Sequence, residues 1–96
     1  MKKLVFKMFK KENITIFPNP TTKGKVVNLM LHNTGNYAVQ LVNENAVALH
    51  EQEFKVNNKQ EINLFNIPVE INRGCYYIKV VNTENNTSYT STLTVL

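Results

Sequence analysis

The chain has 96 residues, a length that fits one domain and leaves no room for a second. Hydrophobic residues make up 43% and charged residues 19%, a balance typical of a globular protein and not of a disordered one. With one cysteine, two histidines and no aspartate, the chain has few catalytic or metal-binding groups. Composition therefore argues against an enzyme and excludes an internal disulfide.

The net charge of +4 is concentrated near the N-terminus. Five lysines lie in the first eleven residues, whereas residues 12–96 carry six basic groups against seven glutamates, a net charge of −1. A nucleic-acid-binding protein places its cations along a face of the fold. This distribution does not, so we expect no nucleic-acid partner.

The first twelve residues are basic and apolar. Their apolar run, Leu4 to Phe6, ends at Lys7 and is shorter than the 7–15 or so residues of a secretory signal. No stretch of the chain approaches the roughly 18 apolar residues of a membrane-spanning helix. We interpret residues 1–12 as a linker or an extra strand, with membrane-surface contact a weaker alternative and no stable insertion. Residues 13–96 form the predicted domain.

Short runs of alternating apolar and polar residues follow, separated by Asn, Gly and Pro, a pattern that predicts β-strands joined by turns. Pro18 and Pro20 end the first strand because they lack the N–H groups that a strand requires. The fourth strand is expected to break near Glu51, where the pattern changes face. The predicted strands are 14–17, 26–31, 37–42, 47–56, 60–65, 75–81 and 87–96.

Alternation also assigns the inward side chains of these strands. They are Val27, Leu29, Leu31, Tyr37, Val39, Leu41, Ile62, Leu64, Tyr76, Ile78, Val80, Tyr89, Leu93 and Val95. No window has a helical period, and we see no internal repeat. Seven short strands at intervals of about ten residues predict an all-β, immunoglobulin-like antiparallel sandwich of about seven strands.

Groups that could carry chemistry are scattered. Cys75 with His32 or His50 suggests a thiol and its base, but the sequence offers no third group to orient the base. Cys75 also alternates with the inward Tyr76, so we interpret it as an outward-facing strand residue. The glutamates are too dispersed for a calcium loop. We expect no catalytic, cofactor or metal site.

Several segments, in order, resemble the type A C-terminal sorting domain of the type IX secretion system of Bacteroidetes. The resemblance covers residues 13–96, nearly the whole chain. It rests on Phe17-Pro18-Asn19-Pro20 with Gly24, Val39 to Asn43, Ile62-Asn63-Leu64, Ile67-Pro68 and Gly74-Cys75-Tyr76.

The resemblance implies a non-catalytic address domain. Such a domain directs a cargo protein through the periplasm and outer membrane to the cell surface or the medium, and its partners are the secretion machinery and a sortase-like peptidase. The peptidase cut would fall near Lys10, Lys11, Glu12 and Asn13. The expected recognition residues are Pro18, Asn19, Pro20, Gly24, Gly74, Tyr76, Leu93 and Val95. Their alternative role is architectural: the prolines and glycines shape turns, and the Tyr76 hydroxyl ties down a loop.

Two further hypotheses remain open. The domain could be an immunoglobulin-like binding or spacer module of a cell-surface protein that recognises carbohydrate or protein, with Tyr37, Tyr77 and Tyr89 on its surface. Separately, the last strand, 87–96, is uncharged, and an uncharged strand edge invites pairing with a second copy of the chain. We therefore expect an edge-strand homodimer that Thr92→Lys weakens, because Thr92 is predicted to point outward.

Overall fold

The computed structural model describes residues 14–31, 33–58 and 61–96. These residues form seven strands: β1 (Ile14–Phe17), β2 (Val26–Leu31), β3 (Gly35–Val42), β4 (Ala48–Val56), β5 (Glu61–Asn66), β6 (Gly74–Asn82) and β7 (Ser88–Val95). Within the described ranges, no helix is long and apolar enough to cross a membrane. The interpretation of residues 1–12 and the proposed cut near Lys10 to Asn13 lie outside the described residues.

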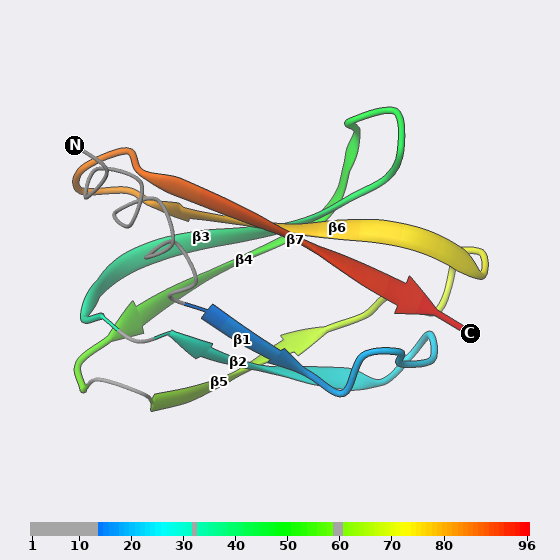
Figure 1. The fold of residues 1–96 in the computed structure, drawn as a ribbon, viewed down its shortest axis with the longest axis horizontal. Helices are drawn as coiled ribbons and strands as arrows, with labels where there is room; N and C mark the ends of the chain where they lie inside the picture. The colour runs from blue at the N-terminus through cyan, green and yellow to red at the C-terminus, as the bar shows by residue number, and fades with distance from the viewer. Residues whose placement is uncertain (1–13, 32, 59–60) are drawn as a thin grey trace, which may run out of the picture.

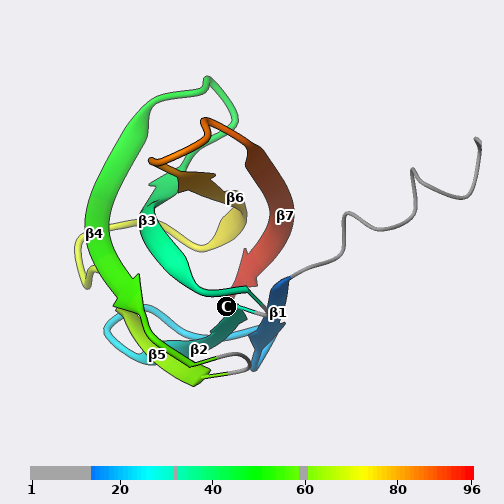
Figure 2. The same ribbon diagram turned by 90° about the vertical axis from the view of Figure 1, so that its left-hand side faces the viewer.

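The strands form two antiparallel sheets. One has the order β1-β2-β5 and the other the order β4-β3-β6-β7. Figure 1 shows the two sheets as layers that face each other, and Figure 2 shows the same layers from the end, where β4 runs beside β5. The predicted all-β antiparallel sandwich is confirmed.

Alternation along each strand places one side of every strand in a common core between the sheets. Its fully buried members include Val27, Leu29, Leu31, Val39, Leu41, Phe65, Ile78, Val80, Leu93 and Val95. Burial of one such aliphatic side chain contributes about 1.5–3 kcal/mol. The predicted inward faces of β2, β3 and β6 are therefore confirmed, and so are Leu93 and Val95 of β7.

The predicted inward face of β5 is wrong. Ile62 and Leu64 are 46% and 56% exposed, whereas Asn63 and Phe65 are buried. The register explains the difference, because Phe65 pairs with Val27 and its neighbours therefore point outward. Since side chains alternate with a period of two, an assignment that is one residue off turns the whole strand over.

β4 has an irregularity close to the predicted position near Glu51. The register shifts between Leu41 and Val42 of β3: Leu41 pairs with His50, and Val42 pairs with Ala48. Leu49 is the extra residue, as in a β-bulge, so the irregularity lies nearer the start of β4 than Glu51. From His50 onward the pairing is regular.

A side-chain amide links the two sheets along one side of the sandwich. Gln52 of β4 accepts a 2.7 Å hydrogen bond from the backbone N–H of Asn66 and donates a 3.3 Å bond to the carbonyl of Leu64. These bonds cover backbone groups of β5 that would otherwise form an open strand edge. On the opposite side of the sandwich, a second side-chain amide, that of Asn19, pairs with the backbone of β7.

Candidate functional site

Several of the expected recognition residues come together around the end of β7, which lies at one end of the sandwich (Figure 1). In the β6–β7 pairing, Gly74 lies opposite Val95, and Tyr76 lies opposite Leu93. On the other side of β7, Thr21 forms a parallel bridge with Val95. The end of β7 is thus held between β6 and the segment that contains the two prolines.

Asn19 makes the central contact of this arrangement. Its Nδ2 donates a 3.0 Å hydrogen bond to the carbonyl of Thr92, and its Oδ1 accepts a 3.0 Å bond from the backbone N–H of Thr94. The carboxamide therefore pairs with β7 as a peptide group of a neighbouring strand would. Two such bonds, each contributing about 0.5–1.5 kcal/mol, fix the position of the Asn19 side chain.

Thr21 continues the pairing through its backbone. Its N–H donates to the carbonyl of Thr94 (2.9 Å), and its carbonyl accepts from the N–H of Leu96 (2.8 Å). Thr21 is also buried, with 5% of its surface exposed. We call the contacts of Asn19 and Thr21 with residues 92–96 the β7 clip.

The prolines on either side of Asn19 explain why a side chain takes part. Pro18 and Pro20 have no N–H to donate, so the backbone between Phe17 and Thr21 cannot form a regular ladder with β7. The Asn19 amide supplies the missing donor and acceptor. Both prolyl peptide bonds are cis, and the two rings are exposed.

A separate structural reason explains why glycine occupies position 24. Its φ is +80°, a conformation that glycine adopts readily and other residues rarely do. A Cβ on Gly24 would lie 2.8 Å from Cγ1 of Val69, and its N–H donates to the carbonyl of Ile67 (2.9 Å). Gly24 thus fits the β1–β2 connection closely against the loop between β5 and β6.

Gly74 and Tyr76 begin β6 and fix the loop before it. Gly74 has a φ of +151°, and the Tyr76 hydroxyl donates to the carbonyl of Asn72. The Tyr76 ring is buried, with 8% exposed. The expectation that this tyrosine ties down a loop is confirmed, and that contact is architectural.

The same device occurs a second time. Two segments share the pattern Asn-x-Gly-x-Tyr: Asn33–Tyr37, which leads into β3, and Asn72–Tyr76, which leads into β6. The Tyr37 hydroxyl donates to the carbonyl of Asn33 (3.0 Å). The strands are antiparallel neighbours, so the two tyrosines lie at opposite ends of the sheet.

Tyr37 differs from its counterpart in its electrostatic surroundings. Burial raises the pKa of the Tyr37 hydroxyl above its usual value, and the charges of Tyr89 and Glu84 raise that pKa further. A hydrogen bond with Asn82 acts in the opposite direction. With 5% of its surface exposed, Tyr37 cannot belong to a binding surface, so the expectation for that residue is wrong.

The Cys, His and Glu side chains that the structure describes are not brought together into a site. Cys75 is exposed on the outer face of its sheet, whereas the His50 ring faces the interior, 5.3 Å from the ring of Phe65. His32 lies outside the described residues. Among the described residues, no three His, Cys or Glu side chains are grouped so that they could hold a metal ion.

Thr21 and Gln52 are the contact residues that sequence reasoning missed. The sequence pattern indicates an ordinary turn residue at Thr21 and a polar strand residue at Gln52. Their partners lie in strands that are distant in the sequence, so no local pattern identifies them. The only sequence signal was indirect: two prolines remove donors from a segment that then needs other hydrogen bonds.

A comparison with curated proteins gives no match. A scan against protein-family models matches residues 15–95 to the secretion system C-terminal sorting domain. This match spans strands of both sheets, Asn19 and Thr21 of the β7 clip, and Gly74 to Tyr76 at the start of β6. The chain therefore belongs to the family of C-terminal sorting domains of the type IX secretion system of Bacteroidetes.

Proposed function

We propose that this domain directs a cargo protein across the outer membrane to the cell surface or medium, and that the end of the sandwich around the β7 clip is what the secretion machinery recognises. Membership of the sorting-domain family supports a secretion signal. The observation that carries the location is the pairing of Asn19 with Thr92 and Thr94. It holds the final strand and the Pro18–Pro20 turn together as one rigid surface.

The clip presents a mixed surface at this end. Pro18, Asn19 and Pro20 are exposed, and so is Leu96 at 59%. Leu93 and Val95 are 0% and 1% exposed, so they support this surface from inside and do not contact a partner. Among the expected recognition residues, we assign direct contact to the exposed turn and an architectural role to Gly24, Gly74, Tyr76, Leu93 and Val95.

The processing step belongs to the same proposal. A sortase-like peptidase would cut near Lys10, Lys11, Glu12 and Asn13, just before β1. A peptidase needs an extended, accessible substrate, and a cut before the first strand would leave the sandwich whole. The domain itself has no catalytic role in this scheme.

A transport assay tests the proposal. Residues 12–96 are fused behind a fluorescent protein that carries an ordinary export signal, in a host with a type IX system and in a mutant that lacks it. Fluorescence at the surface or in the medium only in the intact host is the expected result. Fluorescence trapped in the periplasm of both strains would contradict the address function, and a binding or spacer module would then be favoured.

Two variants separate recognition from folding. Asn19→Asp keeps the acceptor for the Thr94 N–H but loses the donor to Thr92, whereas Leu96→Ser changes an exposed side chain outside the fold's core. If the clip surface is recognised, Leu96→Ser lowers export while the thermal midpoint of the purified domain stays unchanged. The matched control is Asn66→Ala, which changes an exposed asparagine at the end of β5, in the three-stranded sheet. This variant should be exported normally.

A further inference from the structure

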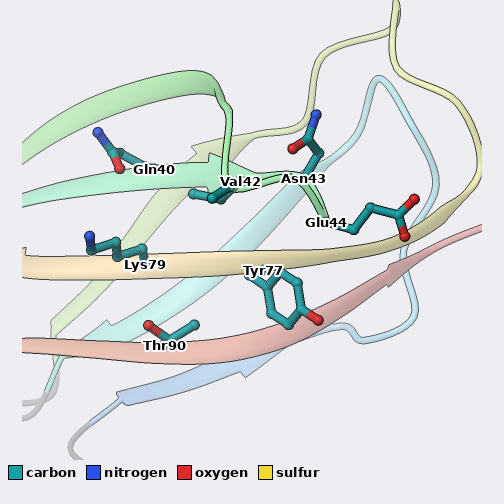
Figure 3. A pocket seen from close by; sticks show the side chains of 8 residues that line it. Gln40, Val42, Asn43, Glu44, Tyr77, Lys79 and Thr90 are labelled. Atoms are coloured by element: carbon teal, nitrogen blue, oxygen red, sulfur yellow. The ribbon is translucent and has the colours of Figure 1, made fainter.

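The outer face of the four-stranded sheet carries a groove unrelated to the β7 clip. It has a volume of about 370 Å³ and lies over β3, β6 and β7, beneath the loop that joins β3 to β4 (Figure 3). We call it the Tyr77 groove. The lining residues used in this argument are Gln40, Val42, Glu44, Tyr77, Lys79 and Thr90.

The side chains in the groove form two rows set by the strand register. Val42 lies beside Tyr77, and in the next row Lys79 lies between Gln40 and Thr90. Tyr77 is 38% exposed, so part of its ring faces solvent. The groove therefore combines an aromatic and aliphatic floor with an amide, an ammonium and a hydroxyl in the adjacent row.

The loop above the groove is held in place by its own hydrogen bonds. Asn43 Oδ1 accepts from the backbone N–H groups of Asn45 and Val47 (2.9 Å each), and the Asn43 N–H donates to the carbonyl of Val47 (3.0 Å). Ala46, which also lines the groove, has a φ of +65°, rare for a residue other than glycine. Gln40 is fixed as well, because its Nε2 donates to Glu51 Oε1 (2.9 Å). The loop and the Gln40 amide are thus held in place before any ligand arrives.

From these observations we infer that the Tyr77 groove binds a neutral saccharide. A pyranose ring has a face of C–H groups that packs on an aromatic ring and an edge of hydroxyl groups that donate and accept hydrogen bonds. Tyr77 and Val42 suit the face of the sugar. Gln40, Lys79 and Thr90 supply donors and acceptors for one edge of the sugar, and Glu44 supplies acceptors on the other side of Tyr77 (Figure 3).

Other ligand classes fit the groove less well. An extended peptide seeks an open strand edge for its main-chain hydrogen bonds, but the groove lies over β3 and β6, which are interior strands of the sheet. A nucleic acid requires several cations, whereas Lys79 shares the groove with Glu44 and lies in the same row as Glu51. The balance of one positive group against carboxylates favours an uncharged polar ligand.

Titration of the full 96-residue chain by ¹H–¹⁵N NMR tests the inference. The probes are maltotriose, cellotriose, mannotriose and chitotriose, each raised to about 10 mM so that a site with a Kd of about 1 mM approaches saturation. Saturable shifts at the backbone amides of residues 40–46, 77–79 and 90 with at least one trisaccharide are the expected result. No saturable shift with any of the four, or shifts confined to other residues, would overturn the inference.

Matched variants assign the binding to the groove. Tyr77→Thr, which keeps a strand-forming residue, should weaken the binding at least about tenfold. Phe17→Thr removes a ring of similar exposure, 37%, from the other sheet and should leave the affinity unchanged. Glu44→Ala, on the exposed loop, provides a second change that the fold tolerates, and it should weaken the binding too. Affinity unchanged in both Tyr77→Thr and Glu44→Ala would refute the assignment.

Discussion

Oδ1 of Asn19 accepts a 3.0 Å hydrogen bond from the backbone N–H of Thr94, a residue 75 positions later in the chain. With the bond from Asn19 Nδ2 to the carbonyl of Thr92, it makes one side chain act as a short strand beside β7. Gln52 does the same for β5 on the opposite side of the sandwich. Two side-chain amides thus cover backbone edges that would otherwise be open.

Removing the Asn19 amide should destabilise the domain. Asn19→Ala leaves the Thr92 carbonyl and the Thr94 N–H without their protein partner, and we expect a loss of about 1–3 kcal/mol in the free energy of unfolding. Urea denaturation followed by circular dichroism measures this loss. Asn66→Ala is the control and should change the free energy by no more than about 0.5 kcal/mol. Equal effects of the two substitutions would contradict the clip.

A methyl group at position 24 should be costly for two reasons. Gly24→Ala places a Cβ against Val69 and forces alanine into a φ of +80°, so we expect a loss of about 1–3 kcal/mol. Val69→Ala in the same chain removes the close contact and should recover part of that loss. Gly74→Ala meets no atom within 4 Å, so a loss there measures the cost of a positive φ, +151°, without a close contact. A double variant no more stable than Gly24→Ala alone would leave the backbone conformation as the sole cause.

The orientation of β5 can be tested with adjacent residues. Phe65→Ala empties a position that is 0% exposed and should cost about 3–5 kcal/mol. Leu64→Ala changes a side chain that is 56% exposed and should cost less than about 1 kcal/mol. Thermal and urea unfolding of both variants provide the comparison. A larger loss for Leu64→Ala than for Phe65→Ala would show that Leu64, and not Phe65, faces the core.

Because of Tyr37, the free energy of unfolding should decrease as the pH becomes alkaline. Because its folded-state pKa is raised, the folded chain holds the phenolic proton more tightly than the unfolded chain does, for which the pKa is about 10. Its contribution is complete below about pH 10 and is lost as the pH rises through the folded-state pKa.

Comparison with the Tyr37→Phe variant isolates the contribution of the Tyr37 hydroxyl to the free energy of unfolding. The variant lacks the hydrogen bond to Asn33 and should be less stable by about 0.5–1.5 kcal/mol at neutral pH. The difference between the two proteins should narrow above about pH 10, when measured by urea unfolding at several pH values. A constant difference up to pH 11 or so would show that Tyr37 does not titrate differently in the two states.

Self-association, if it occurs through β7, should use the half of the strand that the clip leaves uncovered. Asn19 and Thr21 pair with residues 92–96, whereas around Ser88 and Thr90 the described residues provide no neighbouring strand. We expect a concentration-dependent dimer that Thr90→Lys weakens, because charge on an edge opposes pairing. Thr92→Lys should act less strongly, since the clip already covers that position. Light scattering that shows a monomer at high protein concentration would contradict this prediction.

Much of the fold was accessible from local pattern. Alternation identified all seven strands, and it placed Val39 of β3 and Ile78 of β6 correctly in the core. Alternation failed at β5, because apolar residues occur on both faces of this strand: Leu64 lies on one face and Phe65 on the other. Local alternation cannot choose between two such faces; the choice depends on which residue pairs with Val27 of β2.

The amino-acid sequence by itself determined the strands, the turns at the prolines and glycines, and the ordered motifs that identify the sorting-domain family. Only the tertiary structure decided that Asn19 pairs with the final strand, that Gln52 covers β5 and that Tyr77 faces a groove. Strand and turn preferences arise from neighbouring residues, which a linear pattern records. The contacts that build the candidate sites join segments far apart in the chain, and they exist only once the two sheets have packed together.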